Sequence, residues 1–152
     1  MLKSKIATSS FLVLTVAVAL MAVGPASVVE AKSKAVKVHE DYFTVSDGVK
    51  IHYYTLGKKG PWVMLVHGYI DSAKRMWLGT GIAEALAVNH RVVALDNRNH
   101  GYSDKPTPRG PGRAEDVLEL MDHLKIDKAH IHGYSMGGGI TGRILASNPE
   151  RG

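Results

Sequence analysis

The sequence of 152 residues predicts an α/β fold, with a mostly parallel sheet, an antiparallel leading hairpin and helices on both faces. Asp47-Gly48 lies between two strand-like segments, and such a dipeptide is a strong signal for a two-stranded hairpin. Short apolar runs follow, of the kind found in strands buried on both faces, and they alternate with helical patterns. This alternation favours parallel strands covered by helices on both sides.

The expected elements follow in order along the chain. They are hairpin strands at 42–46 and 49–55, a strand at 62–66, a helix over 73–88, a strand at 91–95, a polar loop over 96–112, a helix over 113–125, a strand at 128–133 and a helix over 137–148. The helix over 73–88 is expected to present one buried stripe, formed by Met76, Ile82, Ala83, Leu86 and Ala87. Asp71 and Ser72 are expected to cap its start.

The first residues have the layout of a secretory signal peptide. Lys3 and Lys5 give a positive start, and residues 11–23 form an apolar run with Thr15 as its one polar residue. Gly24-Pro25 then breaks any helix. A run of this length covers about 20 Å as a helix, short of the ~30 Å hydrocarbon core of a bilayer. We therefore expect export to the periplasm or the extracellular space, with an uncleaved membrane anchor as the alternative.

Small residues place the cleavage site after Ala31, with Ala26 as a second possibility. The expected organisation is thus a signal peptide over residues 1–31, a short linker over 32–41 and an α/β domain over 42–152.

Composition excludes several classes of protein. The chain has no cysteine, which excludes disulfides, a thiolate zinc site and a thiol nucleophile. The net charge is +5, and its basic clusters, at residues 32–37 and Lys58-Lys59, are not interleaved with aromatic residues. Nucleic-acid binding is therefore not expected.

The most informative motif is Gly133-Tyr134-Ser135-Met136-Gly137. It falls where an expected strand becomes a helix, the context in which G-x-S-x-G forms a nucleophile elbow. The tight turn strains the serine backbone, and the glycines let strand and helix approach without Cβ clashes. The hydroxyl of Ser135 is then exposed above the sheet edge, with Met136 N–H as one oxyanion donor.

Two further segments accompany the elbow. His67-Gly68-Tyr69 follows the strand at 62–66, and the loop 96–104 (DNRNHGYSD) follows the strand at 91–95. In this order and at these separations, the three motifs resemble the α/β-hydrolase fold superfamily. The similarity covers residues 42–152 and is greatest to the esterase, perhydrolase and C–C hydrolase branch. Serine at the elbow argues against the dehalogenase and epoxide hydrolase branches, which use aspartate.

The resemblance implies a serine hydrolase acting on carboxylic esters or related small acyl substrates. Ser135 would be the nucleophile, and the N–H groups of Tyr69 and Met136 would form the oxyanion hole. Gly68, Gly133 and Gly137 would be the motif glycines. The mechanism implies no cofactor and no metal.

One departure from the family pattern is large. In the family the triad runs serine, acid, histidine along the chain, but Ser135 is followed by one carboxylate, Glu150, and by no histidine. We therefore expect this chain to be the N-terminal portion of the fold, as a fragment or a truncated product. Its triad acid and base are expected to lie beyond residue 152, so that the chain alone is inactive.

Two other functions stay open. One is a non-catalytic, hydrolase-like binding protein. The other, which is weaker, is a dinucleotide-binding domain, because residues 137–142 satisfy G-x-G-x-x-G.

Other conspicuous side chains are given structural roles. His67 and His100 are expected to hold loops by hydrogen bonds, since a base must reach the nucleophile's proton. His130 and His132 lie two apart, and a hydrogen-bonded interior pair is favoured over metal ligation because no third ligand is near.

Asp96 is expected to pair with Arg98 or to cap a turn. Trp77 and Tyr134 are candidates for pocket lining or for the core.

Overall fold

The computed structural model describes residues 36–108 and 112–152. The predicted signal peptide lies outside these residues. Among the helices in the described ranges, none is long and apolar enough to span a bilayer.

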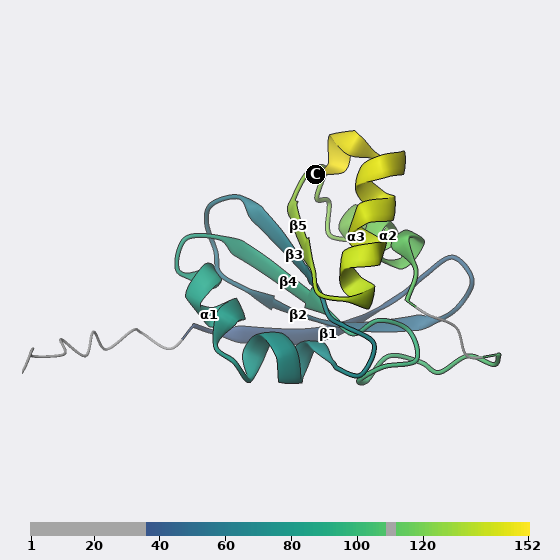
Figure 1. The fold of residues 1–152 in the computed structure, drawn as a ribbon. Helices are drawn as coiled ribbons and strands as arrows, with labels where there is room; N and C mark the ends of the chain where they lie inside the picture. Colours follow the sequence, from purple (N-terminus) through teal and green to yellow (C-terminus); the bar gives the residue numbers. More distant parts are fainter. Residues whose placement is uncertain (1–35, 109–111) are drawn as a thin grey trace, which may run out of the picture. The chain divides into compact units, whose positions relative to one another are not determined.

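Five strands form one sheet in the order β1-β2-β4-β3-β5 (Figure 1). The strands are β1 (Val38–Thr44), β2 (Lys50–Leu56), β3 (Trp62–Val66), β4 (Arg91–Leu95) and β5 (His130–Gly133). β2 runs antiparallel to β1 and β4, whereas β3 is parallel to β4 and β5. Four strands therefore share one direction, which confirms the mostly parallel sheet with a leading hairpin.

The helical elements alternate with the parallel strands. They are the π-helical turn η1 (Lys74–Leu78), α1 (Ile82–Ala87), α2 (Ala114–His123), α3 (Met136–Ser147) and the 3₁₀ turn η2 (Pro149–Arg151). The predicted positions of α2 and α3 are confirmed to within three residues at each end.

The single helix predicted over residues 73–88 is wrong, because η1 and α1 are separate. Gly81, between them, has φ +76°, a left-handed backbone that interrupts a helix. The break turns the following residues, so that Ala83 and Ala87 are buried while Ile82 is exposed, contrary to the expected stripe.

The first hairpin strand starts earlier than predicted, because β1 begins at Val38 rather than at residue 42. Its register pairs Val38 with Leu56 and Thr44 with Lys50. β1 is exposed along almost its whole length and carries charged residues, so no alternating apolar pattern marked it. At the other edge of the sheet in the described residues, β5 pairs with β3 and starts at His130, two residues later than predicted.

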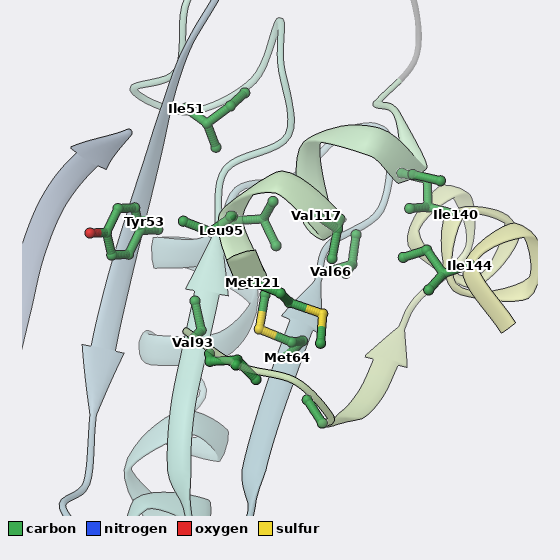
Figure 2. Packing of buried hydrophobic residues seen from close by; sticks show 14 of the residues in the cluster. Ile51, Tyr53, Met64, Val66, Val93, Leu95, Val117, Met121, Ile140 and Ile144 are labelled. Carbon is green, nitrogen blue, oxygen red and sulfur yellow. The ribbon is translucent and has the colours of Figure 1, made fainter. Parts of the chain in front are cut away.

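Alternate residues of the strands pack into two separate hydrophobic cores, one on each face of the sheet. On β3, Met64 and Val66 face α2 and α3, while Val63 and Leu65 face η1 and α1. β4 alternates in the same way. Figure 2 shows the larger core, in which Met121 of α2 points toward Met64 and the isoleucines of α3 point toward Val66. Both faces are thus covered by helices, as predicted.

Candidate active site

The candidate site is the turn between β5 and α3. Ser135 has φ +52° and ψ −113°, a backbone conformation that is costly for a residue with a Cβ. The residue is exposed and α3 starts at the next position. Sequence and structure therefore agree on a strained serine at a strand-to-helix turn.

Two glycines make this turn possible. A Cβ on Gly133 would overlap the carbonyl of Gly137, and one on Gly137 would overlap the carbonyl oxygen of Val66. Neither clash can be relieved by moving a flexible side chain, because both partners are backbone. Gly133 and Gly137 thus let α3 pack directly against β5 and the end of β3, which explains the motif glycines.

The loop after β3 lies beside the elbow. A Cβ built on Gly68 would lie 3.5 Å from the Cβ of Ser135 and 3.0 Å from the Tyr134 ring. A surface hollow of about 460 Å³ opens between the two segments. Its lining residues are Gly68, Tyr69, Ile70, Asp71, Met76, Tyr134 and Ser135.

Two backbone donors at this hollow have no partner among the described residues. The N–H of Tyr69 and that of Met136 donate none of the backbone hydrogen bonds formed there, whereas Gly137 N–H donates to Tyr134 O at 2.8 Å. Met136 is the first residue of α3, and the first N–H groups of a helix point outward with the positive end of its dipole. The arrangement can hold a negatively charged oxygen next to Ser135.

His67 has the structural role that was predicted for it. Its Nδ1–H donates to Gly68 O at 2.7 Å, and its Nε2 accepts the N–H of Asn97 at 3.0 Å. Both ring nitrogens are therefore occupied, and burial lowers the pKa of His67, which keeps the ring neutral. The ring fixes the loop that carries Tyr69 and is not available as a base.

Among the described residues that line the hollow around Ser135, none is a histidine. The Nδ1 of His100 lies 2.9 Å from Arg98 O, and its ring contacts the rings of His67 and Tyr69, so this histidine also holds loops.

The predicted interior pair of His130 and His132 is wrong, because both are exposed on the edge strand β5. Within residues 36–108 and 112–152, no cluster of three or more histidines and carboxylates could hold a metal.

The interaction predicted between Asp96 and Arg98 is replaced by two other networks. Asp96 contacts the Nδ1 of His52 at 2.9 Å and accepts the backbone N–H groups of Ala73 and Tyr102. The alternative role as a cap for turns is therefore confirmed. Arg98 forms two hydrogen bonds with the buried carboxylate of Asp116, at 2.6 and 2.7 Å.

Arg98 also contacts Asp47 in the hairpin turn, at 3.0 and 3.3 Å. Sequence reasoning missed His52 and Asp116 as partners. Asp116 had a usable signal, because it lies beside Val117 and four residues before Leu120, on the buried stripe of the predicted helix. His52 had none, because its two partners lie 12 and 44 residues away.

The remaining predicted positions divide between site and core. Tyr134 is exposed and lines the hollow, whereas Trp77 is buried in the core under η1 and α1. The capping residue of η1 is Ala73 rather than Asp71 or Ser72, although Ser72 Oγ accepts the N–H of Arg75 at 3.3 Å and Asp71 Oδ1 accepts that of Ser72 at 2.9 Å. The glycines of the G-x-G-x-x-G match, residues 137–142, all lie inside α3, so they form no phosphate-binding loop.

Known proteins resemble this chain in sequence and in fold. The sequence profile of the alpha/beta hydrolase fold matches residues 61–151. A dihydrolipoyllysine-residue acetyltransferase component of an acetoin cleaving system, from Pseudomonas putida, is 39% identical over 107 residues, covering 68% of this chain and 28% of that protein. Esterase YbfF of Escherichia coli strain K12 is 36% identical over 90 residues, covering 59% and 34%.

Among solved structures, 2-hydroxy-6-oxo-6-phenylhexa-2,4-dienoate hydrolase (BphD) from Rhodococcus sp. strain RHA1 superposes with a TM-score of 0.68 at 33% identity, covering 76% of this chain and 44% of that one. The chain thus spans between 28% and 44% of the length of these three proteins. With the profile match over most of the described domain, the elbow and the strand order, the chain belongs to the alpha/beta hydrolase fold family.

Proposed function

We propose that the protein is a serine hydrolase of carboxylic esters or related small acyl substrates, with Ser135 as the nucleophile. The observation that carries the proposal is the strained, exposed Ser135 at φ +52°, which lines a hollow of about 460 Å³. Backbone strain of this kind persists where the surrounding structure imposes it, and it concentrates at active sites. The similarity to an esterase supports the choice of substrate class.

In the proposed reaction, Ser135 Oγ attacks the carbonyl carbon as a base removes the hydroxyl proton. The carbonyl electron pair moves to the oxygen, which Tyr69 N–H and Met136 N–H stabilise. The tetrahedral intermediate collapses, the alcohol leaves with a proton, and water then hydrolyses the acyl-enzyme. Each oxyanion donor of this type typically contributes about 10²–10³ in kcat.

The base and the acid that orients it belong to the proposal as well. The residues that line the hollow include no histidine, and His67 is occupied on both ring nitrogens. We propose that both groups come from sequence beyond residue 152, and that residues 1–31 direct export. Mass spectrometry of the exported protein should then find a mature N-terminus at Lys32 or Ser27, whereas an intact Met1 would indicate a membrane anchor.

Ser135→Ala in the protein from the complete reading frame tests the nucleophile. It should abolish p-nitrophenyl ester hydrolysis and fluorophosphonate labelling, with a loss of about 10⁴–10⁶ in kcat and little change in stability. Ser147→Ala is the matched control, because Ser147 is exposed on the same helix. Near-parental turnover by Ser135→Ala would falsify the assignment.

The chain of 152 residues, expressed alone, tests where the base lies. It should show no ester turnover while the longer protein does, because its serine has no base to take the proton. Ester binding without turnover by the longer protein would instead favour a non-catalytic binding protein. Ser135-dependent turnover by the short chain would place the base among residues 1–152.

A further inference from the structure

His52 of β2 lies between two carboxylates. Its Nδ1 is 2.9 Å from Asp96 Oδ2, and its Nε2 is 2.8 Å from Glu40 Oε1. A neutral imidazole has one N–H and one lone pair, so one nitrogen would face a carboxylate with its lone pair. The doubly protonated ring donates to both carboxylates, and the geometry therefore favours His52 as an imidazolium.

The surroundings of His52 are consistent with a fixed positive charge. The side chain is fully buried, and its ring makes edge contacts with the rings of Tyr42, Tyr54 and Tyr102. Burial opposes protonation, but hydrogen bonds to Asp96 and Glu40 outweigh it and raise the pKa of His52.

The other charges around this ring lie further out. Lys50 Nζ is 5.0 Å from the centre of the Tyr42 ring, and Lys74 Nζ is 5.9 Å from that of Tyr102. Both lysines are exposed, so neither replaces the carboxylates as a partner. The protonation of the His52 ring therefore depends mainly on Asp96 and Glu40.

Asp96 links His52 to the loop beside Ser135 through hydrogen bonds. Its Oδ1 accepts the N–H of Ala73 at 2.7 Å, at the far end of that loop. The next residue, Asn97, binds the near end: its Nδ2–H donates to His67 O at 3.1 Å. Adjacent residues at the end of β4 thus hold both ends of the segment 67–73.

The segment held in this way contains Tyr69 and Gly68. Gly68 lies so close to the elbow that a Cβ at this position would be 3.5 Å from the Cβ of Ser135, so a small shift of the segment changes the distance from Tyr69 N–H to the reacting oxygen. We propose that His52 and Asp96 are positioning residues that hold the Tyr69 N–H in place as an oxyanion donor, with Glu40 as the outer support of His52. This inference rests on the proposed function of Ser135.

The proposal predicts a pH dependence with a defined sign. The Asp96 carboxylate stays ionised because, against the effect of burial, His52 and the two backbone N–H groups lower the pKa of Asp96. His52 loses its proton as the pH rises through its raised pKa, which removes one hydrogen bond to a carboxylate. We therefore expect kcat to fall as the pH rises through the pKa of His52. KM should change little, because the oxyanion forms only during the reaction.

Glu40→Gln tests the proposal without touching the hollow. It removes one charge partner of His52, so the alkaline decline should move to lower pH by about 0.5–1 unit, a modest shift because Glu40 is half exposed. Asp41→Asn is the matched control: it neutralises the next residue on the same strand, whose carboxylate contacts its neighbour's backbone N–H. The control should keep the parental profile.

Two measurements are independent of turnover. In Ser135→Ala, nitrogen-15 spectra of His52 should show both ring nitrogens protonated at pH 7, and the protection factor of the Ala73 amide against hydrogen exchange should fall as His52 deprotonates. If Ser135 proves not to be the nucleophile, these measurements still test the link from His52 to the loop. A neutral His52 at pH 7, or identical pH profiles for Glu40→Gln and Asp41→Asn, would overturn the proposal.

Discussion

The loops that follow β4 and β5 both lie at the carboxyl end of the parallel strands, but different interactions hold them in place. The loop after β4 is held by polar groups: Asp96, Asn97 and Arg98 are buried and each forms several hydrogen bonds. The turn after β5 has no such network among the described residues. Its strained Ser135 is imposed by close backbone packing at Gly133 and Gly137.

The two segments therefore have different roles: the loop after β4 supports the site, and the elbow presents Ser135. A buried charge is costly unless it is paired, so the loop after β4 has one favourable arrangement and can act as a rigid support. The elbow, in contrast, leaves the serine hydroxyl exposed and uncommitted. Removing a hydrogen-bond partner from the loop after β4 should therefore lower the free energy of unfolding, whereas substituting Ser135 should change it little.

The largest expected loss comes from Asp116→Ala. The change leaves the guanidinium of Arg98 buried without its two-point partner, and loss of one partner of a buried ion pair costs about 3–5 kcal/mol. Urea denaturation measures the change. Asp122→Ala on the same helix is the control, because the Asp122 carboxylate that pairs with Arg151 is 66% exposed and the pair should contribute at most about 1 kcal/mol. Equal losses in the two variants would contradict the distinction.

Gly137→Ala should break the elbow by steric overlap. Its Cβ would meet the carbonyl oxygen of Val66, and forcing α3 outward should cost about 1–3 kcal/mol, with loss of any Ser135-dependent activity. Gly142→Ala, on the same helix, meets nothing within 4 Å and should stabilise the protein by up to about 1 kcal/mol. Thermal denaturation should move in opposite directions for the two variants.

Ser135→Gly should be more stable than Ser135→Ala. At φ +52° and ψ −113° a Cβ is unfavourable, and its removal should recover about 1 kcal/mol of strain. Denaturation of the two variants side by side gives the difference. If Ser135→Ala were the more stable, the turn would not be strained.

The smallest effect is the pH dependence of unfolding near neutrality, where the two buried histidines act in opposite directions. The pKa of His52 is raised, so its contribution is full below the ordinary value of 6.5 and is lost as the pH rises through the folded pKa. The pKa of His67 is lowered, so its contribution is lost as the pH falls below 6.5. Glu40→Gln should weaken the loss on the alkaline side alone, measurable by denaturation between pH 5 and 9.

The sequence by itself determined the order of the elements, the hairpin and the helix-covered parallel strands. These follow from local patterns: Asp47-Gly48 sets a turn, and short apolar runs such as residues 62–66 are typical of strands buried on both faces. The elbow was also predictable, because Gly133 and Gly137 bracket Ser135 at fixed spacing. The catalytic roles of Ser135, Tyr69 and Met136 stay predictions.

The tertiary structure decided which polar side chains meet. Asp96 binds His52 and Ala73 rather than Arg98, and Arg98 binds Asp116, because these partners lie 18 to 44 residues away in the sequence and meet only in the folded chain. The exposed start of β1 was likewise set by pairing with β2 rather than by local preference. Periodicity reports which residues are buried, but the partner of a buried charge depends on contacts between distant segments, and those exist only once the sheet has formed.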